Sequence, residues 1–181
     1  MEMVGNSILP AVLDADDMEA RTNMAMAATF AGVGFGNAGV HLPHGMSYPV
    51  SGLVKEYRPE GYPVGKAIIP HGMAVILNAP AVFRYTASSN PERHMCAAQL
   101  LGADVNGASP EEAGDLIAER LIYILKKIGV PNGLGGVGYT VDDIPSLVEG
   151  TLPQHRVTKL APRPTGASEL TELFKDSMQL W

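Results

Sequence analysis

The sequence predicts an all-α fold, and three observations support this prediction. No segment alternates apolar and polar residues as a half-buried strand does. Apolar residues recur at helical spacing in one long segment, at Ile117, Leu121, Ile124, Leu125 and Ile128. Helix-start and helix-stop signals divide much of the remaining chain. We expect about six or seven helices in a single domain that spans residues 1–181.

The first predicted helix follows the acidic residues 14–19, which provide N-caps and first-turn carboxylates, and it continues to about Gly32. Residues 24–40 are the most apolar stretch, but they contain four glycines. We interpret this stretch as a buried core helix that is too short and too interrupted to span a membrane. The small residues at positions 31–40 indicate a backbone that another helix or a ligand approaches closely.

The next helices are expected to begin at residues 41–49 and at Pro70, because proline is favoured at the first helical position. Residues 55–66 between them are polar and contain Pro59 and Gly61, which indicates a loop. The helix that begins at Pro70 should run towards Ser88, with a kink at Pro80.

Capping residues mark the remaining helix starts. Asn90 precedes a proline and begins a helix that closes at Gly102. Ser109 and Glu112 have the spacing of a capping box, before a helix that ends at Gly129. A glycine-rich loop follows at residues 133–138. The last two helices start at residues 140–143 and 168–169, and the second ends at Trp181.

Composition excludes several classes of partner. The formal net charge is -6 and no basic tract is present, so we expect neither nucleic acid nor an acidic membrane surface as a partner. Charged residues make up only 18% of the chain. This low fraction suggests that another domain or subunit covers part of the surface, and we expect a homo-oligomer that associates through exposed apolar faces.

The cellular location is predicted from two weak signals. Residues 1–10 lack a basic segment followed by an apolar run, so no signal peptide is expected. The chain has one cysteine, Cys96, within an apolar helical pattern. We interpret it as a buried small hydrophobe. A chain without a disulfide framework fits a reducing compartment, and we expect a cytoplasmic protein.

The histidines are the candidate chemical groups. His44 and His71 each precede a Gly-Met pair and each begins an apolar helix, so they are a plausible pair of metal ligands. Helix capping by their ring nitrogens is the alternative interpretation. A tight site needs three or four ligands, and no further set has a regular spacing. His41, three residues before His44, would share its helix face, whereas His94 and His155 are interpreted as surface residues.

The sequence resembles a known family at these histidines. Residues 35–49 read Phe-Gly-Asn-Ala-Gly-Val-His-Leu-Pro-His-Gly-Met-Ser-Tyr-Pro, and residues 69–72 read Ile-Pro-His-Gly. Both resemble the C-terminal motif of the iron-containing (group III) alcohol dehydrogenases, and most closely the hydroxyacid-oxoacid transhydrogenase branch. The resemblance continues through residues 78–83, 91–94, 101–104, 137–139 and 150–162. It covers the chain from about residue 14 onward, and residues 1–13 match poorly.

The resemblance implies a helical bundle, the C-terminal domain of the dehydroquinate-synthase-like alcohol dehydrogenase fold, with the N-terminal nucleotide-binding domain absent. In that family one Asp and three His hold Fe²⁺ or Zn²⁺. His44 and His71 match the last two ligands, and the first two are expected upstream of this segment. The implied reaction is hydride transfer between an alcohol carbon and NAD. A hydroxyacid-oxoacid transhydrogenase and a non-catalytic helical partner module are the alternatives.

The resemblance also suggests roles for three neighbouring residues. Tyr48 stands where many family members have a further His, and it would act as a proton donor or a steric wall between metal and nicotinamide. His41 would orient a ligand or line a proton path. Phe35 would line the pocket for substrate and cofactor. Each of the three has simple packing as an equally favoured alternative.

The substrate is expected to be a small alcohol, an aldehyde or a hydroxyacid. For a hydroxyacid, Lys55, Arg58 or Lys66 in the loop between the ligands would pair with the carboxylate, although solvated loop charges are the favoured interpretation. We expect this chain alone to be inactive and to bind metal weakly or not at all, because it provides half of a metal site.

Overall fold

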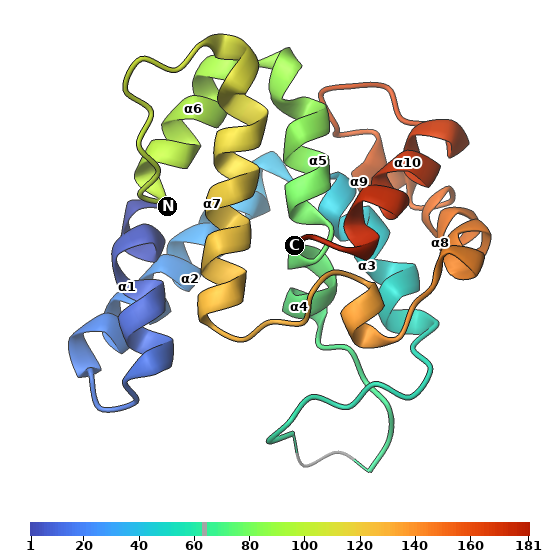
Figure 1. The fold of residues 1–181 in the computed structure, drawn as a ribbon, viewed down its shortest axis with the longest axis horizontal. Coiled ribbons are helices and arrows are strands. Elements are labelled where there is room, and N and C mark those ends of the chain that lie inside the picture. Colours follow the sequence, from blue (N-terminus) through green and yellow to red (C-terminus); the bar gives the residue numbers. More distant parts are fainter. Residues whose placement is uncertain (63–64) are drawn as a thin grey trace.

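The computed structural model describes residues 1–62 and 65–181, and helices form its regular structure (Figure 1). The all-α prediction is confirmed, since no strand occurs in these two ranges. They contain ten α-helices: α1 Glu2–Leu13, α2 Met18–Ala38, α3 Leu42–Gly52, α4 His71–Ile76, α5 Ala79–Thr86, α6 Pro91–Leu100, α7 Ala113–Lys127, α8 Ile144–Thr151, α9 His155–Thr158 and α10 Ala167–Met178. Four 3-10 turns join them: η1 Ala87–Ser89, η2 Pro110–Glu112, η3 Gly135–Val137 and η4 Val141–Asp143.

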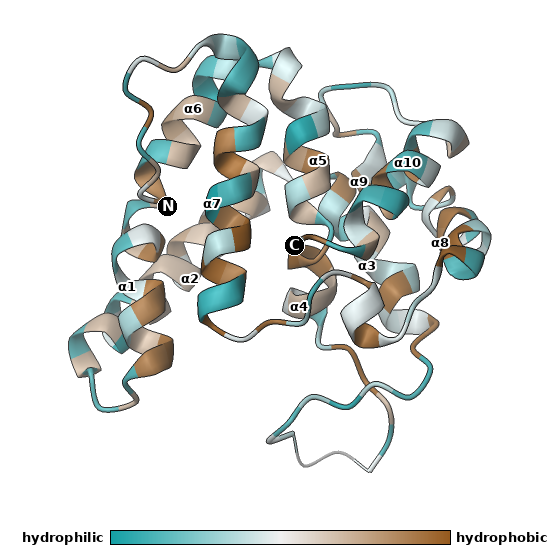
Figure 2. Cartoon of the chain, viewed as in Figure 1, coloured by the Kyte–Doolittle hydropathy of each residue, from teal (hydrophilic) through white to brown (hydrophobic). Residues whose placement is uncertain are grey.

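The helices pack around two hydrophobic clusters. The larger one lies among α3, α4, α5, α8 and α10, and it includes the fully buried Met46, Leu77, Leu147 and Phe174. The smaller one lies between α6 and α7 and is covered by α1. Figure 2 shows apolar and polar residues alternating along α7, as the helical periodicity predicts. Because α5 packs on α7, the two clusters form one continuous body.

Most of the predicted helix starts are confirmed by their caps. The Asp17 side chain accepts a hydrogen bond from the backbone N–H of Ala20 at the start of α2. Asn90 caps α6 in the same way. The capping box at Ser109 and Glu112 is present, with a 3-10 turn ahead of α7. These signals are local, so they need no knowledge of the tertiary structure.

Two predicted helix ends differ in the structure. The expected kink at Pro80 is a break, because α4 ends at Ile76 and α5 begins at Ala79 with the proline in its first turn. The last helix ends at Met178 instead of Trp181. Backbone N–H groups of Leu180 and Trp181 donate to the side-chain oxygen of Asn132, at 2.8 and 3.0 Å, so the tail turns towards the glycine-rich loop.

The prediction that residues 24–40 form a buried core helix is wrong. Residues 24–38 belong to α2, which buries only Ala20 and Ala27. Met26, Phe30 and Val33 follow one another at helical spacing and are 44%, 59% and 63% exposed. We call these three residues the α2 apolar stripe. Hydropathy alone could not distinguish a helix buried in its own domain from one whose apolar residues are exposed.

The close approach predicted for residues 31–40 occurs at Gly39. A Cβ atom there would lie 2.5 Å from Cδ1 of Leu160, and its φ of +75° also favours glycine. By contrast, nothing in the described part of the chain lies within 4 Å of a Cβ built on Gly32, Gly34 or Gly36. Gly39 therefore allows the end of α2 to pack closely on Leu160, two residues before His41.

Other expectations also change. Cys96 is exposed, not buried, because Ala98 and Leu101 occupy the inner face of α6 and Cys96 lies on the opposite side. α1 lacks a clear start signal and contains Pro10, so the sequence did not predict it. His155 begins the short helix α9 instead of lying in a loop.

No helix in the described ranges is long and apolar enough to cross a membrane.

Replacing Phe174 by Ala should lower the free energy of unfolding by about 3–5 kcal/mol, because the fully buried ring would leave a cavity in the larger cluster. The matched control is Phe30→Ala on the α2 apolar stripe, where the ring is 59% exposed and the expected loss is below about 1 kcal/mol. Urea unfolding of dilute protein would measure both losses. Equal losses would contradict the described packing.

Candidate functional site

Two helices place the candidate histidines. α3 follows His41 and presents Leu42 and Met46 to the larger cluster, both with no exposed surface. Its other face carries His44, and Tyr48 follows one turn later. α4 begins at His71, and its Ala74 is fully buried in the same cluster. The apolar side chains of both helix starts therefore face the larger cluster. The two imidazoles lie at the edge of that cluster, which we call the rim.

The structure brings His44 and His71 together. Their ring centroids lie 5.4 Å apart, with the ring planes tilted by 59°. Tyr48 lies beside them, with its ring centroid 6.5 Å from that of His71 and an interplanar angle of 20°. We call His44, His71 and Tyr48 the histidine cluster. Three of the residues predicted for the site therefore meet in space.

The histidine pair fits a shared metal ion. Two imidazoles bound to one tetrahedral ion through metal–nitrogen bonds of about 2.0–2.1 Å have ring centroids about 5 Å apart. Burial lowers the pKa of His44, and the charge of His71 lowers it further, so the neutral, metal-binding form is favoured. Residues 1–62 and 65–181 contain no group of three or more potential ligands. Within the described residues, His44 and His71 are therefore the two imidazoles whose spacing suits one ion.

His41 does not share the helix face of His44, contrary to the prediction. It occupies the N-cap of α3 with φ -128° and ψ -139°, outside the helix. Its Nδ1 is buried and has no hydrogen-bond partner among the described residues. Burial lowers its pKa, and the charges of His44 and His94 lower it further. The neutral form of the His41 ring is therefore favoured, and its buried Nδ1 has no partner among the described residues.

His94 is half-buried, so the interpretation as a surface residue is wrong. Its Nδ1 donates to the carbonyl of Asn90 at 2.9 Å, and its Nε2 lies 3.0 Å from the hydroxyl oxygen of Thr86. The spacing of four residues between Asn90 and His94 was the sequence signal for the first contact.

Phe35, predicted at the cofactor pocket, is 54% exposed at the end of α2.

α9 adds a residue that the sequence analysis missed. A Cβ atom on Gly45 would lie 2.8 Å from Thr158, so glycine at this position allows α9 to pack on α3. This contact places Arg156 at the rim, where its Nη2 donates to the Tyr48 hydroxyl at 3.3 Å. The two residues are 108 positions apart, and no local pattern connects them.

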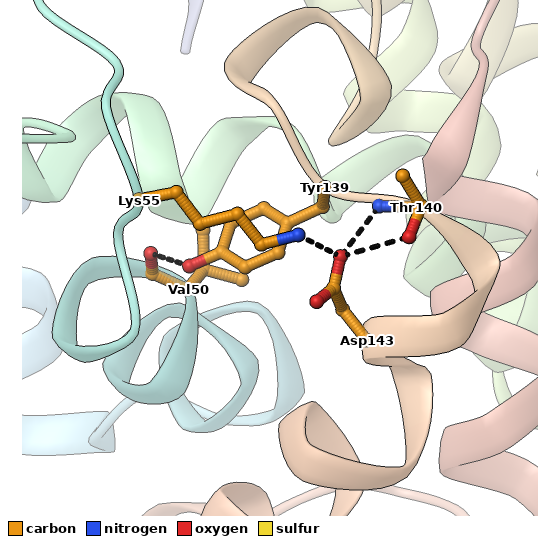
Figure 3. A network of polar contacts seen from close by, with 5 residues as sticks. All are labelled: Val50, Lys55, Tyr139, Thr140 and Asp143. Atoms are coloured by element: carbon orange, nitrogen blue, oxygen red, sulfur yellow. Dashed lines mark hydrogen bonds and ion pairs between the residues drawn. The ribbon is translucent and has the colours of Figure 1, made fainter.

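A second polar network fixes the far end of α3 (Figure 3). The Tyr139 hydroxyl donates to the carbonyl of Val50 at 2.7 Å, which satisfies one carbonyl in the last turn of the helix. Lys55 lies 2.6 Å from the carboxylate of Asp143, which also accepts from Thr140. The candidate role of Lys55 at a substrate carboxylate is therefore unsupported, because Asp143 already pairs with it.

Comparison with known proteins places this geometry in a family. The pattern of the "Fe-containing alcohol dehydrogenase family, C-terminal" matches residues 1–178. The chain belongs to this iron-containing alcohol dehydrogenase family. The match includes residues 1–13, which the motif resemblance did not cover.

Relatives of this iron-containing alcohol dehydrogenase domain share half of its residues. It is 52% identical over 182 residues to the probable mitochondrial hydroxyacid-oxoacid transhydrogenase of Dictyostelium discoideum, and covers 33% of that protein. It is 51% identical over 181 residues to the mitochondrial hydroxyacid-oxoacid transhydrogenase of Rattus norvegicus, and covers 39% of it. Both alignments include the whole of this chain. The chain thus spans between a third and two fifths of these relatives.

The fold is also that of solved members of the family. A crystal structure of 1,3-propanediol oxidoreductase superposes with a TM-score of 0.84 and 26% identity, over 97% of this chain and 42% of the other. The prediction of the C-terminal helical domain of this fold is confirmed.

The expectation of a cytoplasmic protein is contradicted, because the transhydrogenases at 51–52% identity are named as mitochondrial. A single cysteine indicates only a reducing compartment, and the cytoplasm is not the only one.

Replacing Tyr139 by Phe should destabilise the chain by about 1–2 kcal/mol, because the carbonyl of Val50 loses its hydrogen bond. Burial, and secondly the charge of Asp143, raise the pKa of Tyr139 from 10.0 to about 12. The unfolded chain therefore loses this proton first as the pH rises, and the stabilisation disappears between pH 10 and about 12.

Urea unfolding between pH 8 and 12 would test the Tyr139 prediction. The difference in stability between the natural chain and the Phe variant should shrink across that interval. Tyr123→Phe is the matched control, because Tyr123 is 43% exposed and its hydroxyl makes no hydrogen bond with the described residues. A constant difference at every pH would contradict the assignment.

Proposed function

We propose that this chain is the metal-binding C-terminal part of a hydroxyacid-oxoacid transhydrogenase. The observation that carries the proposal is the identity of 51–52%, along the whole chain, with proteins of that name. Identity with 1,3-propanediol oxidoreductase is only 26%. An NAD-dependent alcohol dehydrogenase is the second candidate, favoured by the family and by this solved structure. In either case the chain alone would be inactive, because the relatives are more than twice as long.

His44 and His71 would hold Fe²⁺ or Zn²⁺, as their separation of 5.4 Å and the lowered pKa of His44 support. The remaining ligands would come from the rest of the intact protein, since a metal site needs three or four protein ligands. A bound divalent ion supplies Lewis acidity at the substrate oxygen. The two imidazoles would thus fix the place of that oxygen at the start of α3 and α4.

The neighbouring residues would orient the substrate and its proton. Tyr48 accepts a hydrogen bond from Arg156, which leaves its own proton free to point towards the substrate oxygen. His41, whose neutral form is favoured by burial, would orient a ligand or line a proton path. NAD bound by the rest of the protein would supply the hydride-transfer chemistry, while the two imidazoles and Tyr48 would orient the reacting oxygen of the hydroxyacid or oxoacid. Phe35 would help to cover that site.

His44→Ala and His71→Ala should each weaken Zn²⁺ and Fe²⁺ binding by about tenfold or more, because each removes one of two ligands. Isothermal titration of the purified chain, under argon for Fe²⁺, would measure the affinities. His155→Ala is the matched control, because His155 is exposed on α9 and should leave binding unchanged. Weakening by the control as large as in the test variants would contradict the assignment of the pair.

The α2 apolar stripe supports a further part of the proposal, that the isolated chain self-associates. Burying the exposed parts of Met26, Phe30 and Val33 against a second copy would contribute roughly half of the 1.5–3 kcal/mol that complete burial gives for each side chain. A stripe of three adjacent exposed apolar residues is also typical of a surface that a partner covers.

Phe30→Glu should therefore shift the chain from oligomer to monomer, because a charge would enter the shared apolar surface. Sedimentation velocity over a range of concentrations would measure the change. Leu13→Glu is the matched control, because Leu13 is 66% exposed at the end of α1, outside the stripe. A natural chain that sediments as a monomer at every concentration would contradict self-association.

A further inference from the structure

Arg156 is exposed at the rim of the histidine cluster and forms no ion pair with the described residues. Its single recorded hydrogen bond is long, 3.3 Å, and its acceptor is the neutral hydroxyl of Tyr48. A guanidinium has five N–H donors in a planar fork, so most of its binding capacity is unused. We infer that Arg156 binds the carboxylate of the hydroxyacid or oxoacid substrate, which makes it the specificity-determining residue. This inference rests on the proposed transhydrogenase function.

Other cations of the chain have partners elsewhere. Lys55 pairs with Asp143, and Arg84 pairs with Asp115. Arg163 donates to the carbonyl of Tyr85 and lies over its ring. These contacts hold segments of the fold together. They leave Arg156 as a cation that reaches the histidine cluster without serving the packing of the domain.

The loop cations named by the sequence analysis are less suited to the same task. Arg58 and Lys66 are exposed in the loop between α3 and α4, and neither makes a hydrogen bond or ion pair with the histidine cluster in the described residues. The described part of this loop extends away from the helices (Figure 1). Arg156, in contrast, is fixed on α9, whose packing on α3 is set by Gly45.

The position of Tyr48 sets the geometry of recognition. Its ring lies beside His71, and its hydroxyl receives the Arg156 guanidinium. A short hydroxyacid whose hydroxyl lies at the two imidazoles would extend along this ring, with its carboxylate at the guanidinium. Arginine matches a carboxylate with two parallel N–H···O bonds, which lysine cannot reproduce. The same arrangement would give a simple alcohol no charge-assisted contact, so it favours acids over alcohols.

The test uses two probes of equal chain length, 4-hydroxybutyrate and 1,4-butanediol, with the purified chain. NMR of the arginine Nε–Hε groups should show the Arg156 signal shifting in a saturable way with the hydroxyacid and remaining in place with the diol. Arg156→Gln should weaken hydroxyacid binding by about tenfold, because a charge-assisted pair is lost. Arg156→Lys should recover only part of that loss, because it keeps the charge but not the fork.

Two controls separate direct binding from other effects. Arg58→Gln makes the same chemical change on an exposed loop and should leave hydroxyacid affinity within about twofold. Tyr48→Phe removes the acceptor of the Arg156 hydrogen bond, and it should weaken hydroxyacid binding less than Arg156→Gln does if the guanidinium itself binds the carboxylate. A loss with Tyr48→Phe equal to that with Arg156→Gln would overturn the inference, since Arg156 would then act only through Tyr48.

Other results would also overturn it: no hydroxyacid binding by the natural chain, equal shifts of the Arg58 and Arg156 signals, or equal responses to the acid and the diol. Zn²⁺ titration of Arg156→Gln distinguishes a failure of the Arg156 inference from a failure of the proposed function, which depends on metal binding by His44 and His71. Metal affinity should equal that of the natural chain, because Arg156 contacts neither imidazole in the hydrogen-bond network. Lost carboxylate recognition with intact metal binding would reject the role of Arg156 alone.

Discussion

The candidate site depends on the burial of two helix starts in one hydrophobic cluster. Leu42 and Met46 of α3 and Ala74 of α4 have no exposed surface, and all three contribute to that cluster. Because a helix has a fixed rotation per residue, burying these side chains determines where His44 and His71 point. The two imidazoles are therefore brought together by apolar packing, without a direct hydrogen bond between them. A metal ion would meet ligands that the core has already arranged.

The other end of α3 is held by polar contacts with the opposite part of the chain. Tyr139 satisfies a carbonyl of its last turn, and the Lys55–Asp143 pair holds the first residues of the following loop (Figure 3). The ion pair itself contributes little stability, because its lysine is nearly half exposed. The buried hydroxyl is the stronger constraint, since an unpartnered carbonyl in that place would lack both water and protein donors. α3 is thus fixed at both ends.

Local features of the sequence predicted the fold well. Caps at Asp17 and Asn90 mark helix starts wherever they occur, because their hydrogen bonds span only three residues. The motif around His44 and His71 likewise identified both residues of the pair. The contact of Arg156 with Tyr48 could not be predicted, since it depends on the approach of α9 to Gly45. The same limit applies to His94, whose half-buried place depends on the packing of α6 beside Thr86.

The exposure of α2 and the position of the histidine cluster at the surface of the core have one physical explanation. The larger cluster is complete without α2, so the helices that carry the imidazoles do not need α2 to be covered. The α2 apolar stripe is exposed, and the described residues offer the Nδ1 of His41 no hydrogen-bond partner and contain no group of three potential metal ligands. The residues that stabilise this domain are therefore different from those that would take part in its chemistry. Its core holds the site residues in place, and a covering partner would complete the chemistry at their exposed side.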